Sequence, residues 1–312
     1  MMRIGLFVGT LNVRDAAPTL EGQIQQAVAA ERDGFDGYWT PQIGGADALT
    51  LLALVGRQTS RIEIGTAVVP TFPRHPMMLA QQALTTQASA DGRLVLGIGL
   101  AHKTSVEGRW GLKFDTPALH MEQYLTVLRS LVDTGSVDYD DTLFRVSGEI
   151  QRASTSPLPI CIAALAPRML RIAGELADGT ITWMAGLRTI ETHIAPRITR
   201  AAEAAGRPAP RICVGLPICV TDDRQSAFEA AAAFFAGYGG LPSYRRMLDV
   251  EGVEGPADVA IIGDESAVEA QLRGLAAAGA TDFLASIFPA GYDAKGSVAR
   301  TRALLMRLVG NI

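Results

Sequence analysis

A glycine-rich segment followed by a histidine is the first feature of the sequence that could do chemistry. The apolar run that begins at Arg93 ends in GIGLAHK, so Gly97 and Gly99 shortly precede His102. Glycines in a strand leave room for a flat ligand to approach the backbone closely. Histidine titrates near neutral pH and can donate or accept a proton beside a redox centre. His102 is therefore a candidate catalytic residue, and a structural role is the alternative.

A second candidate site follows Ala163, where the sequence reads AALAPRMLRIAGELADG. Small residues end a strand-like segment, and Pro167 takes a favoured first position of a helix. The first turn of this helix would expose backbone N–H groups, and Arg168 adds a positive charge, so a phosphate could bind there. The alternative is a compact turn with a solvated arginine.

The other histidines point to structure rather than to chemistry. His75 lies in PRHP and is expected to form a hydrogen bond at a helix start, whereas His120 and His193 fall within helical patterns as surface or packing residues. The chain contains no HExxH, P-loop or GxSxG motif. Metal-dependent hydrolysis, phosphoryl transfer and serine hydrolysis therefore have no support.

Composition excludes several further classes of protein. The chain has 312 residues, of which 48% are hydrophobic, and a net charge of −4. This balance, without a basic run, argues against a nucleic-acid partner. No apolar run approaches the roughly 18 residues that a membrane span requires. The three cysteines lack metal-binding spacing and are expected to be buried free thiols in a reducing cytoplasm: Cys161, Cys213 and Cys219.

Strand-like and helix-like segments alternate along the whole chain. The expected strands are apolar on both faces, as parallel strands covered by helices are, and they begin at residues 3, 35, 61, 93, 158, 179, 211 and 282. This alternation predicts an α/β protein with a single domain, residues 1–312, folded as a (β/α)8 TIM barrel.

Two irregular stretches are expected at the C-terminal face of this barrel, where barrel enzymes place their sites. Residues 101–116 follow the fourth strand. Residues 237–262 form a long insert rich in Gly and Pro, which is a candidate lid or dimer element. The segment SAVE, from Ser266 to Glu269, has the spacing of a capping box at the start of the helix before the last strand.

Four segments together resemble the luciferase-like monooxygenase family, the barrel enzymes that use flavin or the deazaflavin coenzyme F420. They are GFDGYW from Gly34, IEIGTAVVPTFPRHP from Ile62, GRLVLGIGLAH from Gly92 and APRMLRIAGELADG from Ala166. Their order and spacing match the family over nearly the whole chain, and the sequence is similar to the actinobacterial branch that binds F420. The resemblance implies a homodimeric oxidoreductase with a small-molecule substrate.

The resemblance also implies where the cofactor would lie. The third strand would end in a bulge with a non-prolyl cis peptide bond between Ala67 and Val68, against the ring of the cofactor. The segment after the fourth strand would border the ring or ribityl chain, and the segment after the fifth strand would follow the cofactor to its phosphate. The residues expected to bind the cofactor are Thr66, Ala67, Val68, Gly99, Leu100, Ala101, Ala163, Ala164, Leu165, Ala166 and Arg168.

Three positions depart from the dehydrogenases of this family. Gln42 stands where the sugar-phosphate and alcohol dehydrogenases begin an Asp-His pair, and His102 stands where the sugar-phosphate dehydrogenases carry Glu. Gly186 takes the place of a lysine near the cofactor phosphate, with Arg188 or Arg168 as candidate substitutes. Alcohol oxidation by the mechanism of those dehydrogenases is therefore not expected.

The resulting hypothesis is an F420-dependent oxidoreductase that transfers a hydride between C5 of the deazaflavin and a small organic substrate. His102 would donate or accept the accompanying proton, and Gln42 would orient substrate or cofactor. With reduced F420, the expected reaction is reduction of an activated double bond or carbonyl. Two alternatives remain: an FMN-dependent two-component monooxygenase that uses O2, and a non-catalytic F420-binding carrier or sensor.

Overall fold

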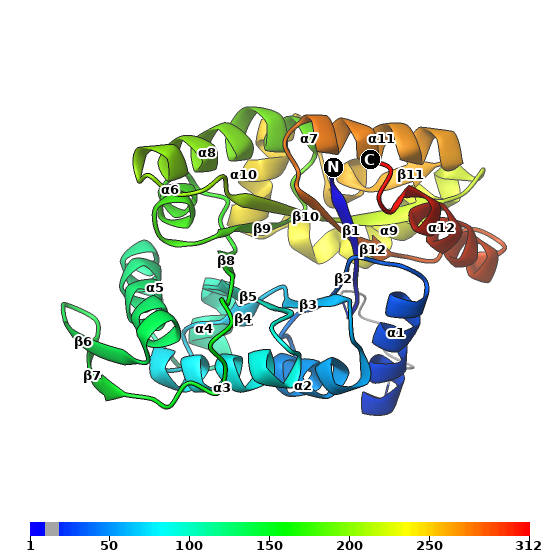
Figure 1. The fold of residues 1–312 in the computed structure, drawn as a ribbon. Helices are drawn as coiled ribbons and strands as arrows, with labels where there is room; N and C mark the ends of the chain where they lie inside the picture. The colour runs from blue at the N-terminus through cyan, green and yellow to red at the C-terminus, as the bar shows by residue number, and fades with distance from the viewer. Residues whose placement is uncertain (10–18) are drawn as a thin grey trace.

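The computed structural model describes residues 1–9 and 19–312, and Figure 1 shows its helices arranged around a set of strands. The main sheet of the described residues has ten strands, of which β4 continues the line of β3 and β11 pairs with the carboxyl-terminal end of β10. The remaining parallel strands close into a ring because β9 pairs with both β8 and β10. The predicted (β/α)8 barrel is confirmed.

The barrel strands follow one another around the ring in nearly sequential order. Their bounds are β1 (Arg3–Phe7), β2 (Gly37–Thr40), β3 (Glu63–Thr66), β4 (Val69–Pro70), β5 (Leu94–Gly99), β8 (Ile160–Ile162), β9 (Gly179–Trp183), β10 (Arg211–Val220), β11 (Ile261–Gly263) and β12 (Asp282–Ile287). An antiparallel hairpin stands apart from the barrel sheet and consists of β6 (Ser136–Asp140) and β7 (Arg145–Glu149).

Helices of different lengths connect these strands. The longer ones are α1 (Leu20–Arg32), α2 (Ala48–Gln58), α3 (Pro76–Ser89), α5 (Pro117–Thr134), α6 (Pro167–Leu176), α8 (Ala195–Ala204), α9 (Arg224–Gly239), α10 (Pro242–Glu251), α11 (Glu265–Ala277) and α12 (Ala294–Leu308). The shorter ones are α4 (Lys103–Gly108) and α7 (Leu187–Thr189), which continues through the π-helical turn Ile190–Ile194 into α8. None of the described helices is long and apolar enough to cross a membrane.

Two local expectations require correction. The insert 237–262 is not irregular throughout, because it contains α10, a 3-10 turn at Pro256–Val259 and β11. The helix before the last strand is not capped by Ser266. Asp264 caps it instead, since its carboxylate accepts a hydrogen bond of 2.8 Å from Ala267 N. An aspartate is as good a cap as a serine, and it lies one residue before the first helical residue.

Charged side chains close the amino end of the barrel. Arg211 Nη2 lies 2.8 Å from Glu63 Oε1 and 2.5 Å from Asp282 Oδ1, and Arg3 Nη1 lies 2.9 Å from Glu63 Oε2. The Asp282 side chain is only 5% exposed, so it depends on these arginines for compensation of its charge. The four residues come from β1, β3, β10 and β12 and join opposite sides of the barrel.

The next layer of the barrel interior is filled by Trp39. This side chain is 1% exposed, and the guanidinium of Arg211 lies 5.9 Å from the centre of its ring. A Cβ atom at Gly37 would lie 2.7 Å from the indole Nε1, one at Gly5 would lie 2.9 Å from it, and one at Gly65 would overlap the ring. Glycine at these inward positions is therefore required by the volume of the indole.

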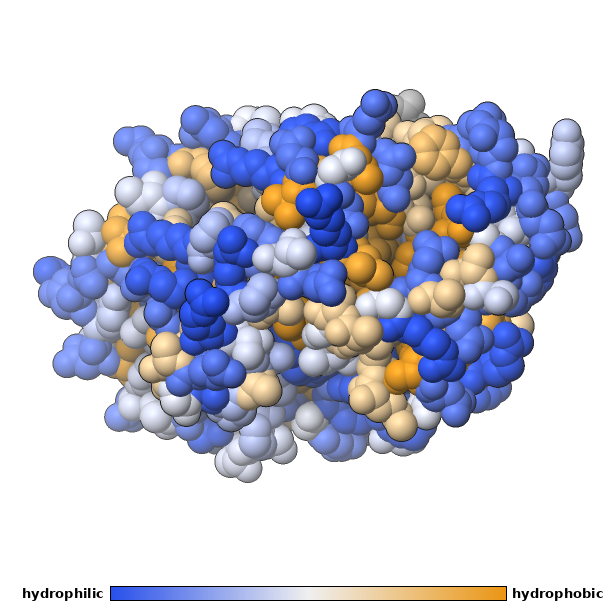
Figure 2. All heavy atoms as spheres, turned by 90° about the horizontal axis from the view of Figure 1, so that it is seen from above, coloured by the Kyte–Doolittle hydropathy of each residue, from blue (hydrophilic) through white to orange (hydrophobic). Residues whose placement is uncertain are grey.

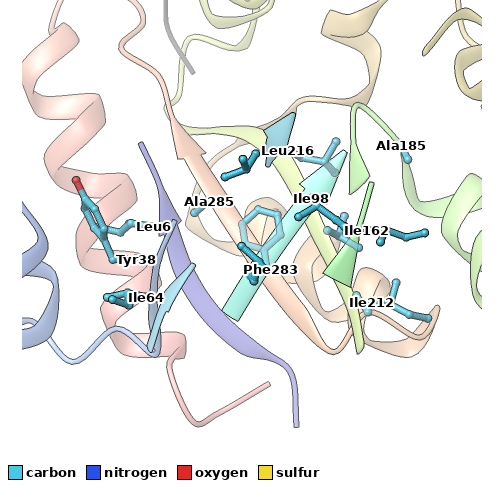
Figure 3. Close-up of a cluster of buried hydrophobic side chains, with 14 of the residues drawn as sticks. Leu6, Tyr38, Ile64, Ile98, Ile162, Ala185, Ile212, Leu216, Phe283 and Ala285 are labelled. Carbon is cyan, nitrogen blue, oxygen red and sulfur yellow. The ribbon is translucent and has the colours of Figure 1, made fainter. Parts of the chain in front are cut away.

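A larger apolar cluster lies between the strands and the helices. Figure 3 shows part of it, with Leu6, Ile64, Ile98 and Phe283 on neighbouring strands. The two termini lie next to each other. Met2 N donates a 2.7 Å hydrogen bond to Ile312 O, and Figure 1 shows both termini on one side of the barrel. Seen from above, most of the surface is hydrophilic, and hydrophobic residues are visible mainly in one hollowed region (Figure 2).

The segment that leads from β4 to α3 rests on a cluster of rings. His120 stacks flat on Phe72, with ring centres 4.0 Å apart, and its Nε2 lies 3.1 Å from Thr71 Oγ1. Tyr124 and Phe144 pack on the other edges of the same imidazole. Burial lowers the pKa of His120 from 6.5 to about 4, so the imidazole is neutral at neutral pH.

Replacement of Arg211 by Met tests the charged layer. The Arg211→Met variant should lower the free energy of unfolding by up to about 3 kcal/mol, because Glu63 and Asp282 then share only Arg3. Urea unfolding measures this, with the exposed Arg57→Met as the control. Equal losses in the two variants would show that the layer does not hold the barrel together.

The buried His120 should make stability depend on pH. Between pH 6.5 and about 4 the unfolded chain binds a proton at this residue that the folded chain does not. The free energy of unfolding therefore falls as pH is lowered through this window and is fully retained above it. The difference in the free energy of unfolding between wild type and His120→Asn should change across the window. Parallel curves for His120→Asn would contradict this prediction.

Candidate functional site

The third barrel strand is interrupted at its carboxyl end by a cis peptide bond. This bond joins Ala67 and Val68 between β3 and β4, as the sequence resemblance implies. Ala67 N donates a 2.9 Å hydrogen bond to Thr40 O, and Gln42 N donates one of 3.4 Å to Val68 O. The ends of β2 and β3 are thereby fixed to each other at the mouth of the barrel.

Three strand ends meet at this bond. The Thr66 hydroxyl donates to Gly97 O at 2.7 Å and accepts from Gly97 N at 2.8 Å. A Cβ atom at Gly99 would lie 2.6 Å from Val68 Cγ2 and 3.2 Å from the Ala163 methyl group. The side chains of Ala67, Val68 and Ala163 are half-buried, so they form a shallow apolar floor.

This floor fits the face of a flat ring. It consists of backbone and small side chains, and any residue larger than glycine at position 99 would disturb it. Pockets for planar ligands are mostly apolar with a few polar groups placed at their edges. The predicted residues that contact one another here are Thr66, Ala67, Val68, Gly99 and Ala163, together with Gly97.

His102 lies immediately after this floor. Ala101 takes a left-handed conformation, with φ 58°, and His102 then begins α4. The His102 ring is half-buried, and its centre lies 5.5 Å from that of Tyr244. Burial lowers the pKa of His102 below 6.5, so the imidazole is neutral at pH 7 and can accept a proton.

Gln42 has a structural contact of its own. Its Oε1 accepts a 2.7 Å hydrogen bond from Ala48 N at the start of α2. The side-chain carbonyl is therefore engaged in the protein, and the amide N–H groups make no hydrogen bond to the described residues. Gln42 lies beside the cis bond through its backbone contact with Val68, at 3.4 Å. Its role toward substrate stays a prediction.

The segment from Ala163 to Ala166 leads from β8 into α6. Leu165 O accepts a 2.8 Å hydrogen bond from His193 Nε2, and Ala164 N lies 3.3 Å from Thr180 Oγ1. Arg168 stands on the first turn of α6, where its exposed guanidinium lies 3.4 Å from Glu122. The positive charge is shared with that carboxylate, and among the described residues Arg168 makes no hydrogen bond or ion pair with the floor.

Gly186 is closed off by a carboxylate from α10. Glu251 accepts hydrogen bonds from Arg188 N at 3.1 Å, Thr189 N at 2.7 Å and Thr189 Oγ1 at 2.7 Å. A Cβ atom at Gly186 would lie 2.5 Å from Glu251 Oε1. The Glu251 carboxylate therefore supplies the negative charge that the N-terminus of α7 favours. It also leaves no room for a side chain at position 186.

Three aromatic residues at the mouth were not identified from the sequence. Trp183 ends β9, and its ring centre lies 5.8 Å from that of Tyr238 on α9. Tyr238 packs edge-on against Tyr244 of α10, at 5.4 Å. Tyr244 in turn faces His102. For the two tyrosines, the signal in the sequence is the run GYGGLPSY, residues 237–244, which opens the insert.

The remaining histidines and cysteines take the expected structural places. His75 begins α3, where its Nδ1 accepts a 3.3 Å hydrogen bond from Met77 N. His120 and His193 are packing residues and are each only 9% exposed. All three cysteines are buried free thiols.

Two surface pockets lie away from the strand ends that form the floor. One, of about 350 Å³, is lined by Arg224, Phe228 and Gln271 among others. The other, of about 380 Å³, lies beside Arg129 and Asp178. Neither contains a residue of the floor or His102, so the convergence of strand ends, rather than pocket size, marks the candidate site.

Comparison with known proteins adds independent information. The chain matches the luciferase-like monooxygenase family over residues 2–303. A putative coenzyme F420-dependent oxidoreductase of Mycobacterium tuberculosis is 29% identical over 275 residues, which cover 79% of this chain and 78% of that protein.

Solved structures share the fold. The coenzyme F420-dependent tetrahydromethanopterin reductase of Methanopyrus kandleri superposes with a TM-score of 0.81 at 20% identity, over 99% of both chains. An F420-dependent secondary alcohol dehydrogenase, in complex with an F420-acetone adduct, gives 0.80 at 18% identity, over 97% of this chain and 98% of the other. The FMN-bound oxygenating constituent of 3,6-diketocamphane monooxygenase from the CAM plasmid of Pseudomonas putida gives 0.76 at 17%, over 99% of this chain and 97% of the other.

At these identities the structural likenesses establish the barrel and leave the chemistry open. The match to the family's sequence model is stronger evidence than these structural likenesses. It spans residues 2–303, which include every strand of the barrel and the cis bond at its mouth. The chain belongs to the luciferase-like monooxygenase family.

Proposed function

We propose that the protein is an F420-dependent oxidoreductase that transfers a hydride between the deazaflavin and a small organic substrate. The observation that carries the proposal is the apolar floor at the cis Ala67–Val68 bond, bounded by Gly99 and Ala163 and followed directly by His102. The similarity to a putative F420-dependent oxidoreductase over 79% of the chain supports the choice of coenzyme.

The residues of the floor would bind one face of the ring. Ala67, Val68 and Ala163 offer small apolar surfaces, and the left-handed turn at Ala101 directs the chain around its edge. The first turn of α6, with Arg168, would meet the phosphate end. When bound, the deazaflavin would supply the hydride chemistry at its C5 atom.

His102 would handle the proton that accompanies hydride transfer. Because burial lowers its pKa, the imidazole is neutral at pH 7 and acts most readily as an acceptor of a proton. Donation from His102 would first require protonation from solvent, which becomes easier as pH is lowered. Gln42 would orient a ligand through its amide N–H groups, since its carbonyl oxygen is held by Ala48 N.

The same floor could accept the ring of FMN, which keeps a two-component monooxygenase as the second candidate. A non-catalytic F420 carrier is the third. The homodimer and the cytoplasmic location that the sequence implies belong to this proposal as well, and light scattering of the purified protein checks the first.

Titration with coenzymes tests the proposal. Purified protein should bind F420 more tightly than FMN, as measured by the quenching of coenzyme fluorescence. Val68→Trp, which fills the floor, should weaken F420 binding by at least about tenfold. A matched exposed change, Leu54→Trp on α2, should leave binding unchanged. Absence of tight binding of either coenzyme would sink the cofactor assignment, and O2 consumption with reduced FMN would favour the monooxygenase.

Replacement of His102 separates catalysis from binding. His102→Ala should lower turnover by about 10²-fold or more, as expected for loss of a general acid–base group, and change F420 affinity much less. Steady-state rates with an enone, nitro and carbonyl panel give turnover, and fluorescence titration gives affinity. His75→Asn serves as the control. Equal losses in turnover and affinity would reassign His102 to cofactor binding.

A further inference from the structure

We propose that Tyr244 is a substrate-binding residue whose hydroxyl donates a hydrogen bond to the carbonyl oxygen of an uncharged, unsaturated or aromatic carbonyl compound. This inference rests on the proposed function and names the class of substrate for the same site. Tyr244 lies on α10 in the insert, far in sequence from the strand ends that form the floor.

The Tyr244 ring is held by a chain of ring contacts that starts inside the barrel. Phe7 of β1 packs edge-on against Trp183, with ring centres 5.3 Å apart. Trp183 packs against Tyr238 at 5.8 Å, and Tyr238 packs against Tyr244 at 5.4 Å. His102 lies on the other side of Tyr244 at 5.5 Å. These rings form one aromatic wall, which we define as Phe7, Trp183, Tyr238, Tyr244 and His102.

Helix α10 fixes this wall against the barrel. Its last residue, Glu251, is bound by three hydrogen bonds at the start of α7, and Thr189 Oγ1 also donates to Met247 O at 3.1 Å. The ring of Tyr244 is therefore placed before a ligand arrives. A group that is already oriented loses little conformational entropy on binding.

The Tyr244 hydroxyl makes no hydrogen bond to the described residues. It is also absent from the set of fully buried polar atoms that lack a partner. The Tyr244 side chain is half-buried, so its hydroxyl can donate to an acceptor that enters the mouth. Burial raises the pKa of Tyr244, so the phenol keeps its proton at neutral pH. A neutral phenol beside a neutral imidazole provides one donor and one acceptor.

The Tyr238 hydroxyl lies deeper in the same wall. Burial raises the pKa of Tyr238, and the indole N–H of Trp183 partly opposes that rise. Trp183 Nε1 nevertheless makes no hydrogen bond of normal geometry to the described residues. Tyr238 therefore supports the ring of Tyr244, and Tyr244 is the phenol adjacent to His102.

This arrangement suits reduction of a carbonyl. The reduced coenzyme of the proposed function would supply the hydride for the new C–H bond at the carbonyl carbon, and the π electron pair would move to the oxygen. That oxygen takes the proton of the Tyr244 hydroxyl, which gives the alcohol. The phenolate then recovers a proton from water, with His102 as the relay.

The carboxylate at the end of α10 disfavours an anionic substrate. Glu251 already places a carboxylate at the start of α7, on the helix that carries Tyr244. A second anion there would meet repulsion and would have to displace three hydrogen bonds. Aromatic rings, in contrast, gain by packing against flat unsaturated ligands.

Binding of 4-(dimethylamino)cinnamaldehyde tests the inference without turnover. The absorbance of this neutral aromatic enal shifts to the red when its carbonyl oxygen accepts a strong hydrogen bond. Wild type should bind it with a red shift. Tyr244→Phe should lose most of the shift and bind about three- to tenfold more weakly, as expected for one hydrogen bond. Tyr139→Phe, whose phenol contacts Asp141 on the hairpin, is the matched control.

The outcomes separate this inference from the proposed function. An unchanged shift and affinity in Tyr244→Phe, with native circular dichroism, overturns the role of Tyr244, even where F420 binds. Absence of probe binding to wild type overturns the carbonyl class. Equal or tighter binding of 4-carboxybenzaldehyde than of benzaldehyde contradicts the uncharged class. A Tyr244-dependent shift in a protein that fails to bind F420 supports the carbonyl site and counts against the coenzyme.

Discussion

The volume of one indole ring determines how the barrel is filled. Trp39 occupies the interior, and Gly5, Gly37 and Gly65 on three neighbouring strands leave the space that it needs. Below it, Arg211 meets the ring face and binds Glu63 and Asp282. The amino end is thereby closed by charge, and Trp39 fills the middle together with smaller buried side chains such as Val95, Ile181 and Leu284. Only the carboxyl end stays available for a ligand.

This closure explains why the strand ends carry the site. Because the interior below is filled, the proposed ligand would rest on the layer formed by Val68, Gly99 and Ala163. The cis bond between Ala67 and Val68 and the left-handed Ala101 both lie in this layer. The backbone is irregular where the ligand would bind and regular where the barrel is only packed. Function here depends on loops that a rigid scaffold holds in place.

Local patterns were sufficient for the fold and for part of the site. The eight strands follow from short apolar runs separated by helical periodicity, and the cis bond from a segment whose order of residues is characteristic of the family. Long-range contacts were not accessible in this way. The meeting of Tyr244 with His102 joins residues far apart in sequence, and the choice of Asp264 over Ser266 as a cap depends on where the helix begins.

Glu251 and Gly186 show how one carboxylate restricts the residue allowed at a neighbouring position. The carboxylate fills the space that a side chain at position 186 would need, and it holds α10 on the barrel through Thr189. A lysine at position 186 would therefore require Glu251 to leave, and α10 would lose its anchor. Residue 186 and the anchor of α10 therefore depend on each other, and a side chain could be added at position 186 only together with a change at Glu251.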